Sequence, residues 1–553
     1  MTASVPHPGT MSSGRFNAFL AISSGLLLGL SFPPTPLYSL AHIGLLPLLF
    51  LLDRLSRYGE IARFSYLAMF VFHLITLYWV GGFTHMRDGY LVVSGASLLL
   101  AHPMFYWIPI LSFVFVRKQL GETAALVSFP FLWVGFEYFH ALGEFSFPWL
   151  TLGNSQAYDL NRIQIAEYAS VFGISFFIVA FNTLGFVFIK KIAFNVWKFS
   201  SRPGIAVFSA LLIVYGGPIV FGISASDSYN LHEERTMKVG IVQPNIDPYE
   251  KWGEGFHSKW DSYLRQMDIL IDQTKRMSSE SLDVIVWPET AIPFYILLPQ
   301  NRQYLGQLRQ ELDSIGTPVF AGLPDGSYRD STSASPTAQW IEGAGAFFEG
   351  FNSATLLLPA QDVDTVYHKV VLVPFAERIP HAERLTFLIE PLKWSVGISS
   401  WGKGDHQVVF ELPLRSGEAA SFGGMICYEL VFPSYVRTFV EQGAEFLVII
   451  SNDSWWGHTS GAYQLAAYSV IRAVETRRWI VRCANGGISG VIDPAGRFYN
   501  KTEFLEATSV IGTIGARTER SFYVRHGDLV GKGCLTAFFV FMAAAFVRRL
   551  GTS

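Results

Sequence analysis

Hydrophobic and polar positions follow two different patterns along this chain. Up to about Gly222 the sequence is a succession of long apolar runs separated by short polar turns, and the tail beyond about Asp528 is apolar again. Between Asp227 and Asp528, short apolar runs alternate with amphipathic segments. Because a membrane-spanning helix needs about 20 mostly apolar residues, this pattern predicts a multi-span helical membrane domain joined to a soluble domain.

Eight apolar segments are candidate membrane spans. They are Phe16–Phe32, Leu37–Leu52, Phe64–Phe83, Tyr90–Val116, Ala124–Leu142, Ile165–Ile189, Ile205–Phe221 and Cys534–Val547. The first two are short and are separated by Pro33-Pro34-Thr35-Pro36, so one merged span is the alternative. The count of eight predicts a membrane domain of seven helices at 1–225, a soluble domain at 226–528 and a C-terminal transmembrane helix at 529–553.

Basic residues are unevenly shared among the loops between these segments. Arg87 and Arg162 are alone in one set of short loops. The other set and the two ends of the chain carry Arg15, Arg54, Arg57, Arg63, Arg117, Lys118, Lys190, Lys191, Lys198, Arg202, Arg548 and Arg549. Since cytoplasmic loops are enriched in Lys and Arg, we expect both termini in the cytoplasm and the soluble domain on the other side of the membrane.

The soluble region predicts strands that alternate with helices, which indicates a layered α/β domain. The expected strands are Met237–Val242, Leu282–Trp287, Pro318–Leu323, Phe351–Leu358, Asp364–Leu372, Phe446–Ile450, Ile480–Ala484 and Ser489–Ile492. The expected helices are His257–Met277, Asn301–Ile315, Glu429–Phe439 with Pro433 in its first turn, and Gln464–Arg477. Ser327–Gly345 is rich in Ser, Gly and Thr and is expected to be a surface loop.

Composition narrows the class of protein further. Only 15% of the residues are charged, against about 25% in an average soluble protein, and a net charge of −3 gives no sign of a nucleic-acid partner. The three cysteines, Cys427, Cys483 and Cys534, are too few for a disulfide framework, and no Cys/His spacing typical of a metal site is present. We therefore expect no cofactor and no metal.

Reactive side chains stand at the ends of three predicted strands, where α/β domains collect their active groups. Cys427 follows an apolar strand and precedes a helix, a corner that can expose the thiol and favour its thiolate form. Glu289 can take the thiol proton, and Lys369 can stabilise an oxyanion. Glu377 could keep Lys369 charged and oriented. Together these residues are typical of nucleophilic cysteine chemistry.

The strings around these residues resemble those of a known family. Val286-Trp287-Pro288-Glu289-Thr290, Tyr367-His368-Lys369-Val370 and Gly424-Met425-Ile426-Cys427-Tyr428-Glu429 are similar to the Glu-Lys-Cys triad motifs of the carbon-nitrogen hydrolase (nitrilase) superfamily. With the predicted spans and the Phe147-Pro148-Trp149 loop, the chain is identified as a member of the apolipoprotein N-acyltransferases. The resemblance implies an αββα sandwich on a multi-span helical membrane domain.

The resemblance also implies roles for individual residues. Glu289 is the expected base, Lys369 the oxyanion-stabilising cation and Cys427 the nucleophile. Further residues that match positions important in the family are Glu377, Tyr428, Glu429 and Trp252. Tyr463 departs from the pattern, because many members carry a histidine there.

The implied reaction has two steps. Cys427 takes an acyl chain from a phospholipid, expected to be phosphatidylethanolamine, as a thioester. The α-amino group of the diacylglyceryl-cysteine of an apolipoprotein then receives it. The implied setting is a monomer in the bacterial inner membrane, with the catalytic domain periplasmic.

Two other classes of protein compete with this interpretation. A membrane-anchored amidase or nitrilase would give the acyl group to water, but one anchor would suffice for it. A non-catalytic scaffold is disfavoured because Glu289, Lys369 and Cys427 are all present.

Polar and aromatic residues in the membrane region leave two questions open. The aromatic loops Val80–His85 and Glu144–Gln156 suit either a membrane-interface belt or the wall of a lipid site. Glu137, Glu167 and His73 lie in or beside apolar runs, where ionisable groups are functional or pair between helices.

Overall fold

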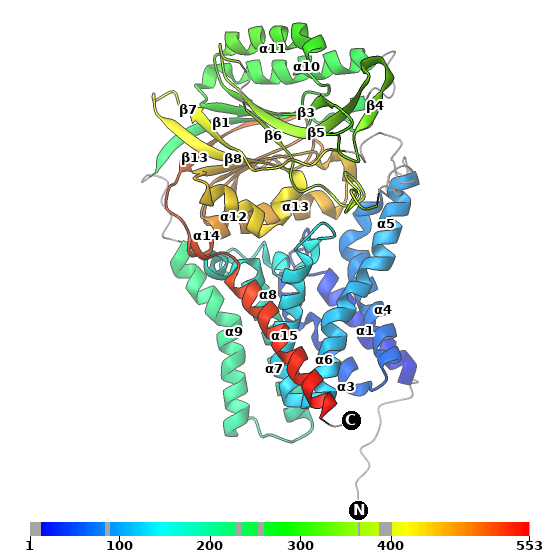
Figure 1. The fold of residues 1–553 in the computed structure, drawn as a ribbon. Coiled ribbons are helices and arrows are strands. Elements are labelled where there is room, and N and C mark those ends of the chain that lie inside the picture. The colour runs from blue at the N-terminus through cyan, green and yellow to red at the C-terminus, as the bar shows by residue number, and fades with distance from the viewer. Residues whose placement is uncertain are drawn as a thin grey trace, which may run out of the picture.

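The computed structural model describes residues 13–82, 89–226, 234–252, 259–362, 365–385 and 401–551. The described chain forms a bundle of helices below a sandwich of two sheets, with the two halves of the sequence meeting along one broad junction (Figure 1). The C-terminal helix runs from the sandwich down the bundle to the far end (Figure 1).

Helices make up the whole of the lower part. They are α1 (Ser13–Gly29), α2 (Ala41–Gly44), α3 (Leu46–Arg54), α4 (Tyr58–Leu77), α5 (Gly89–Ala101), α6 (Trp107–Leu120), α7 (Glu122–His140), α8 (Ala166–Ala193), α9 (Arg202–Ser226) and α15 (Leu529–Leu550). Five stretches of the described chain are long and apolar enough to cross a membrane, namely Tyr58–Gly81, Leu91–Leu120, Arg162–Ala193, Arg202–Ala225 and Leu529–Leu550. The count of eight spans stays a prediction.

Two predicted spans are less regular than expected. The segment Leu37–Leu52 is divided among a 3-10 turn, α2 and α3, and the prolines after α1 separate it from the first helix. The fourth segment is interrupted between α5 and α6 by a 3-10 turn at His102–Tyr106. Pro103 lies in that turn, and a proline removes one backbone donor from an α-helix.

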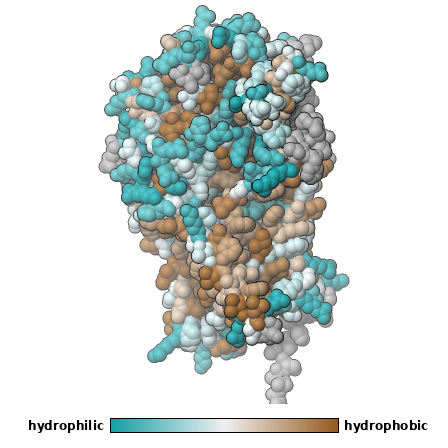
Figure 2. Space-filling model, viewed as in Figure 1, coloured by the Kyte–Doolittle hydropathy of each residue, from teal (hydrophilic) through white to brown (hydrophobic). Residues whose placement is uncertain are grey.

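The bundle exposes apolar side chains on its surface. On the face in view in Figure 2, brown residues gather on the lower half of the molecule, with hydrophilic residues above them and at the lower end. On α9, Ile213 and Val220 are 68% and 67% exposed. Exposed side chains of this kind are suited to lipid, since an apolar surface of this extent is rare on soluble monomers.

The upper part is an αββα sandwich, as expected. Its elements are β1 (Arg235–Gln243), α10 (Lys259–Arg276), β2 (Val284–Val286), α11 (Arg302–Ile315), β3 (Val319–Arg329), β4 (Gln339–Ile341), β5 (Ala346–Leu357), β6 (Val366–His368), β7 (Val409–Pro413), β8 (Ala419–Ile426), α12 (Pro433–Glu441), β9 (Phe446–Ser451), α13 (Ser460–Thr476), β10 (Ile480–Ala484), β11 (Gly490–Ile492), β12 (Phe498–Tyr499), β13 (Thr508–Ala516) and α14 (Phe522–His526). One sheet has the order β13-β1-β2-β3-β5-β4 with β6 on β5, and the other has the order β12-β11-β10-β9-β8-β7.

The two helical layers lie in different surroundings. Helices α10 and α11 cover the outer face of the first sheet, whereas α12 and α13 lie between the second sheet and the membrane helices (Figure 1). Nearly every residue of α13 is buried, as expected for a helix packed on both sides.

The expectation that Ser327–Gly345 is a loop was wrong at its two ends. Strand β3 continues to Arg329 and pairs with β5 down to Phe347, and β4 adds to the same β5. The outer part of this hairpin is held by backbone hydrogen bonds and lies outside the hydrophobic core. Its sequence therefore lacks the alternation of apolar and polar residues that predicts a strand.

Candidate active site

Cys427 lies at the corner where β8 ends. A 3-10 turn, Cys427–Val431, follows the strand, and α12 begins only at Pro433. The helix predicted from Glu429 therefore starts four residues later, because the proline takes its first position. Cys427 has φ +51° and is half-buried. Positive φ is uncommon for residues other than glycine, and such strain is typical of functional positions.

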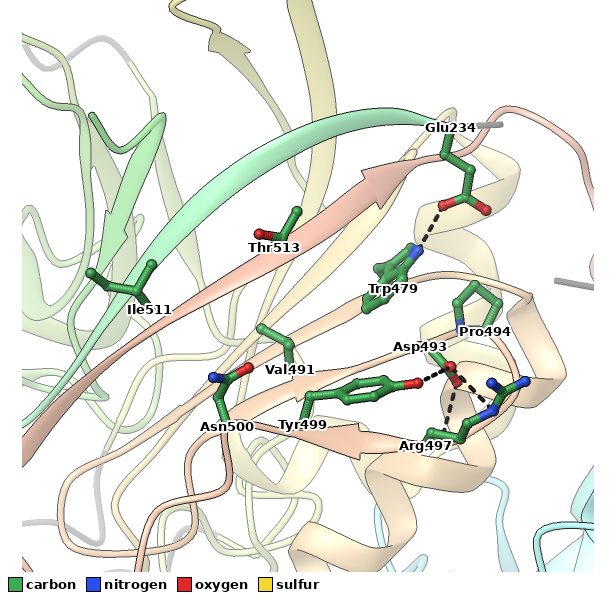
Figure 3. Close-up of a pocket in the computed structure, with 10 residues that line it drawn as sticks. All are labelled: Glu234, Trp479, Val491, Asp493, Pro494, Arg497, Tyr499, Asn500, Ile511 and Thr513. Carbon is green, nitrogen blue, oxygen red and sulfur yellow. Dashed lines mark hydrogen bonds and ion pairs between the residues drawn. The ribbon is translucent and has the colours of Figure 1, made fainter. Parts of the chain in front are cut away.

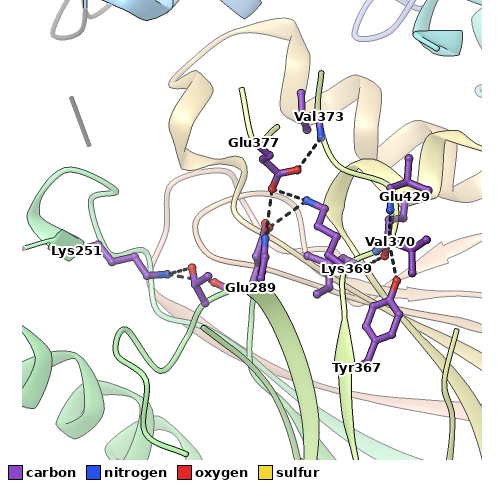
Figure 4. A network of polar contacts seen from close by, with 12 residues as sticks. Lys251, Glu289, Tyr367, Lys369, Val370, Val373, Glu377 and Glu429 are labelled. Carbon is purple, nitrogen blue, oxygen red and sulfur yellow. Dashed lines mark hydrogen bonds and ion pairs between the residues drawn. The ribbon is translucent and has the colours of Figure 1, made fainter. Parts of the chain in front are cut away.

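The carboxylates and the lysine predicted for the site do come together. Lys369 is 1% exposed, with its Nζ 2.8 Å from Glu377 Oε1 and 3.5 Å from Glu289 Oε1. Glu377 also accepts a hydrogen bond of 2.8 Å from the Val373 backbone N–H, which fixes its orientation (Figure 4). Burial lowers the pKa of Lys369, but the negative charges of Glu377 and Glu289 outweigh this effect, so the net shift is upward. The lysine is thus a permanent cation.

Asn352, which the sequence did not single out, joins the two carboxylates. Its Nδ2 donates to Glu289 Oε1 at 2.7 Å and lies 3.3 Å from Glu377 Oε1. Asn352 is on β5, beside the strand that precedes Lys369. An asparagine in a polar strand gives no sequence signal of its own, and only the pairing of β5 with β6 brings it here.

The thiol of Cys427 differs from expectation. Burial, reinforced by the negative charge of Glu289, raises its pKa well above the usual value, and the opposing effect of Lys369 is smaller. This shift favours the neutral thiol at rest, so burial opposes the thiolate form that the corner was expected to favour. The helix that would have favoured a thiolate begins several residues away, at Pro433, and helix-dipole effects fall off within the first turn.

Glu429 holds the Cys427 corner against the lysine strand. It is fully buried, and its Oε1 accepts hydrogen bonds from the Tyr367 hydroxyl and from the backbone N–H groups of Val370 and Val371 at 2.6, 2.8 and 3.0 Å (Figure 4). Its Oε2 accepts from the Ile426 N–H at 2.8 Å. Burial raises the pKa of Glu429. The Glu429 side chain thus joins the end of β8 to the segment around Lys369 by hydrogen bonds and is not exposed to a substrate.

Tyr428 connects the site with the membrane domain. Its hydroxyl donates to the Ser146 carbonyl at 3.0 Å, and its ring stacks on those of Phe147 and Trp149. Trp149 is only 2% exposed. Phe147 and Trp149 of the aromatic loop before α8 therefore pack against the sandwich, whereas Phe145 of the same loop is 50% exposed.

Gln464, at the start of α13, is a second residue that the sequence did not single out. Its Oε1 accepts hydrogen bonds from the indoles of Trp79 and Trp149 at 3.1 and 2.7 Å. Its Nε2 donates to the carbonyls of Pro33 and Thr76, each at 3.1 Å. One amide thus joins three loops of the membrane domain to the sandwich.

The ionisable groups of the membrane helices have packing partners. Glu137 accepts hydrogen bonds from the Trp133 indole and the Leu152 N–H at 3.0 and 2.9 Å. Glu167 forms an ion pair of 2.9 Å with Arg477 of the sandwich. His73 contacts the Met69 carbonyl and His102, each at 2.6 Å.

Trp252 ends a 3-10 turn, Glu250–Trp252, and its side chain lies outside the described part of the structure. Within the described residues, no group of three or more His, Cys, Asp and Glu side chains is arranged to hold a metal.

Cavities occur both beside the site and away from it. One of about 350 Å³ lies between the end of α7 and the start of α12, lined by Leu142, Ser146, Phe172 and Val371 among others. A larger one, about 420 Å³, lies at the edge of the sandwich around Trp479 and Tyr499 (Figure 3). Glu289, Lys369, Glu377 and Cys427 line neither cavity. The first lies nearer to the site, because Val371 follows Lys369 by two residues, so cavity size alone does not locate the chemistry.

Comparison with known proteins places these features in a family. Residues 24–184 match the model described as apolipoprotein N-acyltransferase N-terminal domain, and residues 238–521 match carbon-nitrogen hydrolase. The chain is 36% identical to the apolipoprotein N-acyltransferase of Chlorobaculum tepidum over 96% of this chain and 97% of that protein. It is 30% identical to that of Geobacter metallireducens, over 97% and 96%. Among solved structures, a variant of the amidase from Nesterenkonia sp. AN1 is similar at 16% identity and TM-score 0.34, covering 53% of this chain and 96% of that one.

Proposed function

The chain belongs to the apolipoprotein N-acyltransferase family, and from this premise we propose that it acylates lipoproteins through Cys427. The acyl chain comes from a membrane phospholipid, phosphatidylethanolamine in our proposal. The acceptor is the α-amino group of the N-terminal diacylglyceryl-cysteine of an apolipoprotein. The observation that carries the proposal is the strained Cys427 corner beside the buried Glu289–Lys369–Glu377 cluster.

The first step makes a thioester. Because the resting thiol is neutral, Glu289 takes its proton as the sulfur attacks the ester carbonyl of the phospholipid. The S–C bond forms, and Lys369 stabilises the negative oxygen of the tetrahedral intermediate. The C–O ester bond then breaks, and Glu289 returns the proton to the departing oxygen, which releases lysophospholipid.

The second step transfers the acyl group. The uncharged α-amine of the acceptor attacks the thioester carbonyl, forming the N–C bond. As the C–S bond breaks, a proton from the nitrogen passes through Glu289 to the sulfur of Cys427. The amide product leaves, and the enzyme is restored with a neutral thiol.

The remaining predicted residues support these groups. Glu377 holds Lys369 charged and in place at 2.8 Å. Glu429 clamps the Cys427 corner, and Tyr428 joins it to the aromatic loop of the membrane domain. The supporting role of Trp252 stays a prediction, because its side chain lies outside the described part of the structure.

The junction of the two domains favours lipid substrates. The cavity of about 350 Å³ beside Val371 has an apolar lining from the membrane domain and the sandwich, and small-molecule sites usually have volumes of about 300–1,000 Å³. An amidase would hydrolyse the same thioester with water. That alternative gives no reason for the stacking of Tyr428 on a loop of the membrane domain.

We propose that the protein lies in the bacterial inner membrane as a monomer, with the sandwich periplasmic and both termini cytoplasmic. Support comes from basic residues that lie together near the ends of α3, α6 and α8. Lys190 forms ion pairs with Asp53 and Glu122, and Arg117 donates to the carbonyls of Leu52 and Leu55. We keep 1–225, 226–528 and 529–553 as the proposed domain limits.

Intact-mass spectrometry of the purified protein with phosphatidylethanolamine tests the chemistry. We expect a mass increase of one acyl chain, mapped to Cys427, and its loss when a diacylglyceryl peptide with a free α-amine is added. An adduct that water removes as fast as the peptide does would favour the hydrolase.

Reporter fusions test the orientation. We expect a reporter after Ser553 to be cytoplasmic, and one inserted in the turn at 330–338 to be periplasmic, because basic loops stay in the cytoplasm. The opposite result at either position would contradict the eight-span topology.

A further inference from the structure

Lys251 is a second buried lysine near Glu289, with no role in the steps above. It is 1% exposed, and it lies on the opposite side of Glu289 from Lys369 (Figure 4). Its Nζ donates to the Glu289 main-chain carbonyl at 3.1 Å and to the Thr290 hydroxyl at 2.7 Å. Both of these acceptors are neutral. Burial of an ammonium group whose acceptors are neutral costs folding free energy. A functional role for Lys251 would explain why this cost is tolerated.

The turn that Lys251 contacts is strained and tightly held. Thr290 has φ +47°, which is a genuine outlier for a β-branched residue. Behind this turn, a Cβ added to Gly322 would lie 2.6 Å from the Pro288 carbonyl oxygen and 2.7 Å from the Glu289 Cα. The main chain of Glu289 is therefore fixed by a close-packed glycine on one side and by Lys251 on the other.

Lys251 is itself firmly positioned. Gln266 of α10 donates to the Lys251 carbonyl at 3.0 Å, and Ser262 donates to the preceding carbonyl, that of Glu250, at 2.8 Å. The side chains that reach this turn from α10 are thus neutral. Glu289 is the charged group that acts on the Lys251 ammonium, and Lys369 lies beyond it.

Burial lowers the pKa of Lys251 to about 7, and the charge of Glu289 opposes that shift. The ammonium is therefore present mainly below pH 7. A nearby positive charge favours the ionised form of a carboxylate, and the Lys251 ammonium and the Glu289 charge act on each other in this direction.

We propose that Lys251 is a positioning residue: it holds the main chain of the general base, Glu289, in its strained turn, and its positive charge favours the ionised carboxylate. The inference rests on the proposed role of Glu289 as the base for Cys427. The two lysines then have different functions. Lys369 stabilises the oxyanion, and Lys251 positions the general base.

The test follows the reactivity of Cys427 against pH. Iodoacetamide alkylation, mapped to Cys427 by peptide mass spectrometry, is measured from pH 5 to 9 on the full-length protein in detergent. Thioester formation from phosphatidylethanolamine is measured alongside. In Lys251→Met we expect the midpoint of the acidic limb to move up by about one pH unit in both assays, the lower end of the effect of a nearby opposite charge.

Two further variants separate charge from hydrogen bonding. Lys251→Gln keeps amide donors without charge and should move the midpoint as Lys251→Met does. Lys251→Arg keeps the charge and should restore the midpoint, with a lower maximum rate because its planar group fits the turn less well. Lys275→Met is the matched control, since Lys275 is exposed in α10 and pairs with Glu311, and it should behave as the parent protein.

Folding of each variant is checked by its thermal unfolding transition. If Lys251→Gln folds but keeps the midpoint of the parent protein, the charge of Lys251 does not act on Glu289 and the proposal is overturned. Alkylation needs no lipid, so it reports on Lys251 even if the parent protein forms no thioester. Failure of the parent protein to form a thioester would instead contradict the proposed function.

Discussion

Two buried clusters of the sandwich contain the same kinds of residue, and we propose only one of them as the reactive site. The first combines Cys427 with Glu289 and Lys369. The second combines Cys483 with Asp453 and Arg482, whose side chains form an ion pair of 2.6 Å with both partners fully buried. Each cluster therefore has a thiol, a carboxylate and a cation.

The two thiols differ in backbone setting. Cys483 lies within β10, is fully buried, and its Sγ lies 3.2 and 3.3 Å from the carbonyl oxygens of Val242 and Val286. Cys427 lies past the end of β8 with φ +51° and is partly exposed. Burial raises the pKa of both thiols. Thiol acidity at rest thus does not separate them, whereas access and an available base do.

Removal of each thiol gives the sharpest test of this difference. Cys427→Ala should abolish the acyl adduct, because Cys427 is the proposed nucleophile, whereas Cys483→Ala and Cys534→Ala should keep it. Intact mass after incubation with phospholipid is the measurement. An adduct that persists in Cys427→Ala would mean that the nucleophile lies elsewhere and that the first cluster is not the reactive site.

Replacement of the base should have the next largest effect. Glu289→Gln keeps the shape of the side chain but cannot accept the thiol proton, so thioester formation should slow by about 10²–10⁴, the usual contribution of general-base catalysis. The rate of adduct appearance at saturating phospholipid measures it. A rate close to that of the parent protein would mean that Cys427, like Cys483, has no base.

Exchange of the cation sharpens the role of Lys369. Arginine keeps the charge, but its planar fork replaces a compact point charge held between two carboxylates. We expect severe loss of thioester formation in Lys369→Arg, with phospholipid still bound. Single-turnover rates and lipid binding are measured together. Undiminished rates would show that a long-range field is enough and that Lys369 does not contact the oxyanion.

The second cluster should matter for stability more than for rate. Asp453→Asn leaves Arg482 charged and buried without its partner, which typically costs about 3–5 kcal/mol of folding free energy. The measurements are the thermal unfolding midpoint and the thioester rate per folded molecule, which should fall far less than in Glu289→Gln. A larger loss of rate than of stability would place Asp453 in the catalytic machinery.

Much of the candidate site could be predicted because its residues stand in distinctive local strings. Glu289 and Cys427 each follow a buried strand, and such strand ends converge in α/β domains. Asn352, Gln464 and Lys251 could not be found in this way. Their neighbours come from other strands and from the membrane domain, and each sits in a sequence context shared by many surface residues.

The amino-acid sequence was enough to establish the two-domain plan, since long apolar runs and alternating strands and helices bury their apolar faces in only a few ways. It also determined the residue types of the Glu289, Lys369 and Cys427 site. The upward pKa shift of Cys427 became visible only in the folded structure, where burial and the charge of Glu289 together outweigh Lys369. The tertiary structure also decided that Trp149 of the aromatic loop packs on Tyr428 instead of facing lipid. Desolvation and contacts between distant segments exist only once the chain has folded, and for that reason no local pattern encodes them.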